Sequence, residues 1–275
     1  MGGDLMEKAR RVVFFDSGVG GLSVYRDVKK LNPAVEGYYI FDNECFPYGT
    51  KTPEFLEERV CSILRRMREL YAPAAVVIAC NTASTVVLPQ VRAALDIPVV
   101  GVVPAIKPAA SLSKKKVIAL LATPGTVGRP YTDELISKYA QGCKVIKVGS
   151  PSLASIAERR LSTGYTDVEG IRKAVSPIMD LEGEERPDVA VLGCTHYPFI
   201  SDVLERLMPD IRFIDTGEAI GRRVASVLSS LGDASWQERT GERAFYTGIL
   251  GDYEGRLRMV RSFGFRSLDQ FKIKQ

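Results

Sequence analysis

The chain has 275 residues, of which 45% are hydrophobic and 25% are charged, values typical of soluble globular proteins. This composition excludes a chain that is disordered as a whole, and no apolar run reaches the roughly 18 residues of a membrane span. The net charge of +4 is spread along the sequence. The basic run at residues 114–116 has no interleaved aromatic side chains, so nucleic acid is not an expected partner. The lack of a long apolar run means that no membrane is expected as a partner either.

The cysteine content indicates a reducing environment. There are five cysteines, no C-x-x-C pair, and a single histidine, His196. These features support neither a disulfide framework nor a metal site such as structural zinc. No signal peptide is recognised, so we expect a cytoplasmic location.

Strands and helices alternate along almost the whole chain. The first strand is predicted at residues 11–15, and the glycines within 18–21 allow a tight turn into a helix at 22–31. This turn fits a dinucleotide-binding fingerprint poorly, because Ser23 stands where the third glycine is needed and Asp16 would face a pyrophosphate. A nicotinamide-binding domain is therefore disfavoured.

The remaining elements follow the same alternation. A second strand at 38–42 leads into a Pro- and Gly-containing loop that ends near residue 52, where backbone amides could face a ligand. Further strands are predicted at 75–79, 97–103, 117–122, 145–148, 189–192 and 212–215. Helices are predicted at 53–70, 84–95, 130–140, 153–161, 166–181 and 216–231. Such alternation is typical of parallel sheets with helices on both faces.

Two of the buried strands end in a thiol. Residues 75–79 run into Cys80, and residues 189–192 run through a glycine into Cys194. One buried cysteine is as easily explained by packing as by chemistry. Two thiols at the carboxyl ends of strands, where ligands bind in open α/β sheets, favour a functional site. Cys45, Cys61 and Cys143 lack this placement and are interpreted as packing residues.

The pattern begins again near Lys116, which predicts an α/β fold of two similar domains, each a mostly parallel sheet flanked by helices. Residues 1–103 with 213–275 would form the first domain, which carries Cys80. Residues 104–212 would form the second, which carries Cys194. The active site would then lie in the interdomain cleft, with one thiol on each wall.

Two facing thiols suit the removal of a proton from one face of a carbon and its return to the other face. The unperturbed thiol pKa of ~8.5 is close enough to neutrality for a cysteine to act as base or acid. The α-proton of an amino acid is weakly acidic, so neighbouring polar groups must stabilise the charge that develops. Candidates are Asp16, Asn81 and Thr82 beside one thiol, with Thr195 and His196 beside the other.

Five segments resemble, in the same order, the signature blocks of bacterial glutamate racemases: residues 15–21, 46–49, 79–84, 121–127 and 192–198. The resemblance covers about residues 12–248. It implies a cofactor-independent racemase that interconverts L- and D-glutamate and supplies D-glutamate for peptidoglycan. Either a monomer or a homodimer is expected, and the sequence does not decide between them. Residues 102–108 resemble a branch whose members can need a cell-wall precursor as an activator.

The resemblance also implies residue roles. Cys80 matches the base that deprotonates D-glutamate and Cys194 the base that deprotonates L-glutamate. Asp16 would assist the first thiol and His196 the second, with Glu158 as a further acidic residue beside His196. Substrate binding is implied for Ser17, Pro47, Tyr48, Gly49, Asn81, Thr82, Thr123, Thr126 and Thr195. Thr123 and Thr126 could equally be residues that open a helix.

Two alternatives stay open at this point. The chain could be a racemase of aspartate or another amino acid within the same two-cysteine superfamily. It could also be a non-enzymatic protein that closes its two domains on an anionic amino acid. Only the racemases are expected to exchange the α-proton of their ligand with solvent.

Overall fold

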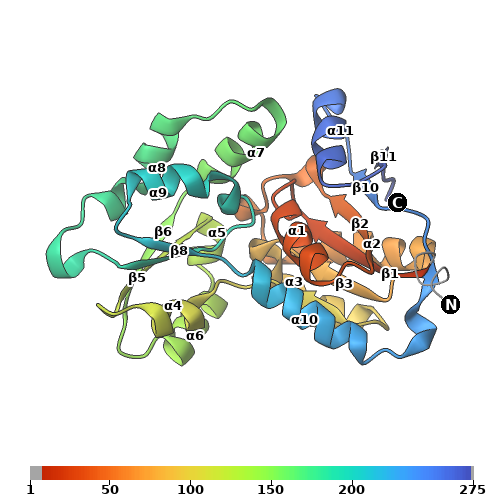
Figure 1. The fold of residues 1–275 in the computed structure, drawn as a ribbon, viewed down its shortest axis with the longest axis horizontal. Coiled ribbons are helices and arrows are strands. Elements are labelled where there is room, and N and C mark those ends of the chain that lie inside the picture. The colour runs from red at the N-terminus through yellow and green to blue at the C-terminus, as the bar shows by residue number, and fades with distance from the viewer. Residues whose placement is uncertain (1–7, 274–275) are drawn as a thin grey trace.

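The computed structural model describes residues 8–273 and contains two sheets (Figure 1). The first sheet consists of β1 (Lys8–Asp16), β2 (Val35–Phe41), β3 (Ala75–Ile78), β4 (Val99–Gly101), β9 (Gln237–Glu238), β10 (Arg243–Tyr246) and β11 (Ser267–Gln270). The second consists of β5 (Val117–Ala122), β6 (Lys144–Gly149), β7 (Val189–Leu192) and β8 (Arg212–Ile214). The strand orders are β11-β10-β2-β1-β3-β4, with β9 paired to β1, and β6-β5-β7-β8. All pairings are parallel except that of β1 with β9, which confirms the predicted α/β fold class.

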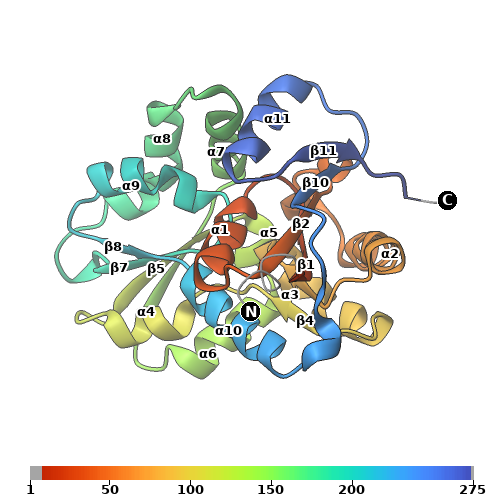
Figure 2. The same ribbon diagram turned by 45° about the vertical axis from the view of Figure 1, so that its right-hand side comes forward.

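Helices cover both sheets, and together they give the molecule two lobes (Figures 1 and 2). The lobe of the first sheet holds α1 (Leu22–Leu31), α2 (Pro53–Tyr71), α3 (Asn81–Ala94), α10 (Gly217–Ser229) and α11 (Tyr253–Ser262). The other lobe holds α4 (Ile106–Leu112), α5 (Pro124–Val127), α6 (Pro130–Tyr139), α7 (Leu153–Thr163), α8 (Val168–Met179) and α9 (Ser201–Leu207). Within residues 8–273, no helix has the length and apolar character needed to cross a membrane.

The start of α3 differs from the prediction. The helix was expected from residue 84, but it begins at Asn81, directly after Cys80. Cys80 occupies the N-cap, and its sulfur accepts a hydrogen bond from the backbone amide of Ala83. Because the thiol satisfies an amide of the first turn, the helix needs no intervening loop.

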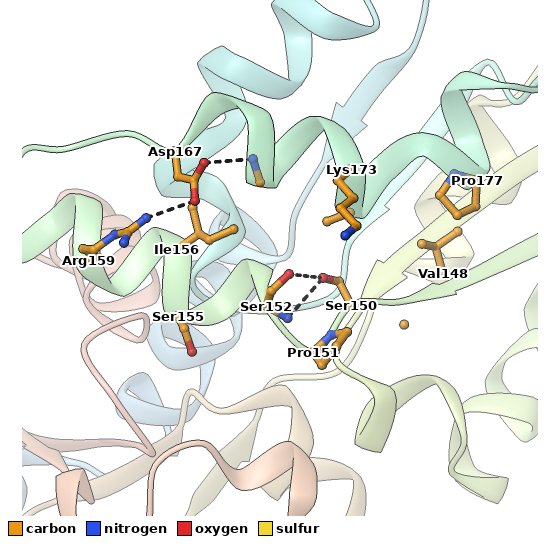
Figure 3. A pocket seen from close by; sticks show the side chains of 13 residues that line it. Val148, Ser150, Pro151, Ser152, Ser155, Ile156, Arg159, Asp167, Lys173 and Pro177 are labelled. Carbon is orange, nitrogen blue, oxygen red and sulfur yellow. Dashed lines mark hydrogen bonds and ion pairs between the residues drawn. The ribbon is translucent and has the colours of Figure 1, made fainter.

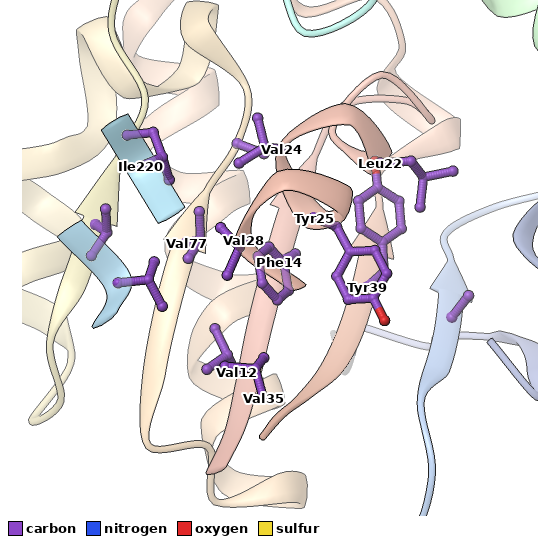
Figure 4. Close-up of a cluster of buried hydrophobic side chains, with 14 of the residues drawn as sticks. Val12, Phe14, Leu22, Val24, Tyr25, Val28, Val35, Tyr39, Val77 and Ile220 are labelled. Atoms are coloured by element: carbon purple, nitrogen blue, oxygen red, sulfur yellow. The ribbon is translucent and has the colours of Figure 1, made fainter. Parts of the chain in front are cut away.

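The first sheet is buried on both faces, which explains the continuous apolar runs of its central strands. Phe14 and Val77 belong to a cluster shared with α1 and α10 (Figure 4), whereas Phe15 and Ile78 belong to a cluster shared with α2 and α3. Successive side chains of β1 and β3 thus point into two different cores. This packing fixes the ends of β1 and β3, where the candidate site begins.

The chain passes from the first sheet to the second after β4 and returns after β8. Because β8 pairs with β7, Phe213 and Ile214 belong to the second sheet rather than the first. The C-terminal strands β10 and β11 extend the first sheet beside β2. We propose two domains that correspond to the two sheets, with the second boundary placed after Ile214 instead of before Phe213.

Candidate active site

Four strands of the two sheets deliver polar side chains to one place. Asp16 ends β1, and Cys80 follows β3 after one residue; Thr123 directly follows β5, and Cys194 follows β7 after one residue. Ladder hydrogen bonds continue beyond both cysteine strands, from Ala79 N to Phe15 O at 2.8 Å and from Gly193 N to Leu121 O at 2.8 Å. The extended backbone therefore holds each thiol firmly at the carboxyl edge of its sheet.

These side chains surround a cavity of about 20 Å³ between the two lobes. Its lining consists of Asp16, Ser17, Phe46, Pro47, Tyr48, Gly49, Cys80, Asn81, Thr82, Thr123, Ala154, Cys194, Thr195 and His196. All the predicted site residues line it except Thr126 and Glu158, which are hydrogen-bonded to lining residues. Phe46 and Ala154 were not predicted. The volume holds about one water molecule, so the walls must separate to admit an amino acid.

The Cys80 thiol lies in a buried, acidic environment. Burial and the negative charge of Asp16 hold the pKa of Cys80 well above its usual value, although the hydrogen bond from the Ala83 amide lowers it. The thiol donates to Ser17 Oγ at 3.8 Å. In this arrangement Cys80 carries its proton and can act as an acid.

Asp16 connects the two walls of the cavity. Its carboxylate is fully buried, and it accepts hydrogen bonds from the Ser17 amide at 2.6 Å and from Thr195 Oγ1 of the opposite wall at 2.8 Å. Burial raises the pKa of Asp16 despite the positive charge of His196 and these hydrogen bonds. A raised pKa suits a carboxyl group that exchanges protons with a thiol near neutral pH.

The Cys194 thiol faces an imidazole that is held from behind by a carboxylate. Cys194 Sγ lies 3.8 Å from His196 Nδ1, and His196 Nε2 lies 2.5 Å from Glu158 Oε2. Burial alone would lower the pKa of His196, but its hydrogen bonds to Cys194 and Glu158 raise that pKa well above its usual value. Burial would raise the pKa of Glu158, yet the hydrogen bond from His196 and the charges of His196 and Arg256 lower it. An imidazolium in this position stabilises a neighbouring thiolate.

Three threonine hydroxyls meet across the cleft. Thr82 Oγ1 lies 3.0 Å from Thr123 Oγ1 and 3.2 Å from Thr126 Oγ1, and the latter two are 3.1 Å apart. Thr123 occupies the N-cap of α5, but its side chain makes no capping hydrogen bond. The hydroxyl instead points to Thr82 in the other lobe, so helix opening does not account for it.

The loop that carries Tyr48 is anchored by a buried ion pair that was not predicted. Asp42 accepts hydrogen bonds from Tyr48 Oη at 2.6 Å and from Arg59 Nε and Nη2 at 3.0 and 2.7 Å. Asp42 is fully buried at the end of β2. The only signal in the sequence was an acidic residue at the end of a predicted strand, and its arginine partner lies 17 residues further along.

A much larger cavity, of about 760 Å³, lies between α7 and α8 and contains neither thiol (Figure 3). Its Arg159 is paired with Asp167, and the amides of Ser152 and Leu153 are bonded to Ser150 Oγ. The small cavity, which both thiols line, is therefore the candidate active site. All five cysteines of the described chain are free thiols, and Cys61 lies on the buried face of α2, where it packs in the core.

Comparison with known proteins agrees with this geometry. Residues 19–224 match the family model of Asp/Glu/hydantoin racemases. The chain is 44% identical over 264 residues to glutamate racemase of Klebsiella pneumoniae, which covers 95% of this chain and 92% of the relative. It belongs to the glutamate racemases.

Solved structures of this family superpose on this chain over nearly its whole length. Escherichia coli glutamate racemase, in complex with L-glutamate and the activator UDP-MurNAc-Ala, gives a TM-score of 0.93 at 40% identity and covers 97% of this chain and 100% of that one. The Bacillus anthracis isoform RacE1 gives a TM-score of 0.78 at 26% identity, covering 96% and 98%. These matches confirm the resemblance found in the sequence motifs.

Proposed function

We propose that this protein interconverts L- and D-glutamate by two-base proton transfer at the α-carbon, without a cofactor. The observation that carries the proposal is the placement of Cys80 and Cys194, which come from different sheets and line the same closed cavity. Each thiol has its own titratable partner, Asp16 for Cys80 and His196 for Cys194. One protein can therefore present a base and an acid to the same carbon.

In the L-to-D direction, Cys194 as a thiolate removes the α-proton and Cys80 as a thiol delivers a proton to the opposite face. The positive charge of His196, held by Glu158, stabilises the thiolate before the reaction. In the D-to-L direction the roles reverse, so Cys80 must first lose its proton, and the neighbouring Asp16 is the group that accepts it. The small volume of the cavity excludes bulk water, and this strengthens the electrostatic interactions among the groups that line it.

The proposed substrate contacts are mainly neutral hydrogen-bond donors. Hydroxyls of the threonine cluster and the backbone of the Tyr48–Gly49 loop would bind the carboxylates. Asn81 Oδ1 is buried and has no hydrogen-bond partner within residues 8–273, so it is free to accept from the substrate ammonium. Neutral donors hold two carboxylates without placing further charges beside the thiols.

Glutamate rather than aspartate is the proposed substrate, because the curated relatives at 41 to 49% identity are glutamate racemases. A direct test is incubation of pure, reduced protein with L-glutamate in deuterated water. We expect the α-proton NMR signal and the optical rotation to decay together. Exchange of aspartate in place of glutamate would favour the related racemase, and no exchange at all would favour a binding protein.

The proposed cellular role is the supply of D-glutamate for peptidoglycan, in the cytoplasm. The five free cysteines support a reducing compartment. The solved Escherichia coli relative contains UDP-MurNAc-Ala as activator, and we propose a cell-wall precursor of this class as an activator here. We expect addition of UDP-MurNAc-Ala to raise kcat/KM; equal turnover with and without it would contradict this part of the proposal.

A further inference from the structure

The Glu158 carboxylate has a partner that the proposed mechanism does not use. Its Oε2 atom bonds to His196 Nε2 at 2.5 Å and to the Val19 amide at 3.1 Å, while its Oε1 atom forms an ion pair with Arg256 Nη1. The Glu158 side chain is 9% exposed and that of Arg256 15%. This ion pair is largely shielded from solvent, so its electrostatic effect exceeds that of an exposed pair.

The charge of Arg256 helps to keep Glu158 ionised. Burial would raise the pKa of Glu158, and His196 and Arg256 together lower it. Arginine stays protonated at every pH at which proteins are studied, whereas an imidazolium loses its proton at alkaline pH. An ionised Glu158 holds the imidazole by Nε2, which leaves Nδ1 directed at Cys194.

The ion pair also joins the two lobes. Arg256 lies on α11, which follows β10 of the first sheet, and Glu158 lies on α7, which follows β6 of the second. Figures 1 and 2 both show α11 beside α7. Val19, the other non-histidine partner of Glu158, also comes from the first lobe. Both contacts thus span the two lobes and would break if the lobes separated at this point.

We propose that Arg256 is a positioning residue for the Cys194 base: it orients Glu158 so that His196 is held against Cys194 when the cleft closes. The inference deepens the proposed racemase function and rests on it. Arg256 does not line the cavity, so it acts through Glu158 and His196. Three other titratable groups face the Glu158–His196 pair. Asp16 and Cys194 lie next to His196, and Tyr39 lies next to Glu158.

The kinetic test compares Arg256→Gln and Arg256→Lys with the matched control Arg258→Gln. Arg258 lies on the same helix, is exposed and has no ion pair within the described chain. We expect Arg256→Gln to lower L-to-D kcat by about tenfold or more, Arg256→Lys to restore much of it, and Arg258→Gln to leave it unchanged. Enantiomers have equal free energies, so kcat/KM must fall equally in both directions and cannot distinguish the two bases.

The diagnostic readout is the isotope effect of α-deuteration. In Arg256→Gln the effect should grow for L-glutamate, whose proton Cys194 removes, and should not grow for D-glutamate. If the ion pair were purely structural, its loss in Arg256→Gln would lower the thermal unfolding midpoint. The isotope effects for L- and D-glutamate would then both equal those of Arg258→Gln. That second pattern would overturn the proposal.

An independent readout uses the single histidine, whose imidazole gives one NMR signal in untagged protein. In Arg256→Gln the pKa of Glu158 should rise, because burial remains and one stabilising charge is lost. The acid-side inflection of the His196 signal should then move to higher pH relative to wild type and Arg258→Gln. An unmoved inflection contradicts the proposal. If wild-type protein fails to racemise glutamate, the proposed function fails, and this titration still decides whether Arg256 controls the Glu158–His196 pair.

Discussion

The two thiols differ in the charge that faces them. Cys80 faces the carboxyl group of Asp16, whereas Cys194 faces the imidazole of His196. A carboxylate disfavours a neighbouring thiolate and an imidazolium stabilises one. At the scale of single residues, this difference in facing charge supports the proposed roles, with Cys80 as the acid and Cys194 as the base of L-to-D turnover.

Replacing either thiol by alanine should abolish racemisation. We expect Cys80→Ala and Cys194→Ala each to lower turnover by about 10³-fold or more, because each removes a general acid–base group. Residual deuterium incorporation should be confined to L-glutamate in Cys80→Ala and to D-glutamate in Cys194→Ala. Near-normal turnover by either variant, measured by circular dichroism, would show that the two-base assignment is wrong. Cys143→Ala serves as the control.

Alkaline pH should weaken the fold through His196. Its pKa is raised in the folded protein, so the stabilisation it gives is complete below the usual imidazole pKa and is lost as pH rises through the raised value. We expect the urea midpoint to fall between neutral and alkaline pH, and to fall less in His196→Asn. Parallel curves for the two proteins would mean that the ion pair with Glu158 contributes no pH-dependent stability.

At the scale of elements, the loop after β2 depends on α2. Asp42→Ala leaves Arg59 without its buried partner and frees Tyr48 Oη. Arg59 keeps Glu44 as a partner, but the buried hydrogen bonds of Asp42 with Tyr48 and Arg59 are lost, so we expect the unfolding free energy to fall by about 1–3 kcal/mol and the KM for glutamate to rise. Glu44 also pairs with Arg59 but is 54% exposed, so Glu44→Ala should cost less than about 1 kcal/mol. Equal losses in the two variants would contradict the anchoring role.

At the scale of the whole molecule, function requires the lobes to open and close. A Cβ atom on Gly125 of α5 would lie 2.6 Å from the backbone oxygen of Gly49 on the opposite wall. We expect Gly125→Ala to hinder closure and to lower kcat/KM about tenfold or more, with little change in the thermal unfolding midpoint. Gly251→Ala, where nothing lies within 4 Å, is the control. Unchanged kinetics in Gly125→Ala would indicate that the active form is more open than the structure.

The sequence by itself determined the fold class, the two cysteine strands and most of the cavity lining. Buried parallel strands are recognisable in the sequence as continuous apolar runs, and the residues that follow them meet at one edge of the sheet. The resemblance to glutamate racemases assigned candidate roles at positions that lie close together in the structure, including Glu158 behind His196.

Only the tertiary structure decided the contacts that join distant segments. The sequence gives no sign that Arg256 meets Glu158, 98 residues earlier, or that Arg59 meets Asp42. The sequence likewise does not reveal that β8 pairs with β7, because a three-residue strand carries no mark of the sheet it joins. Periodicity and strand ends are local properties of the chain. Ion pairs between lobes depend on how whole elements pack, and no local pattern encodes that.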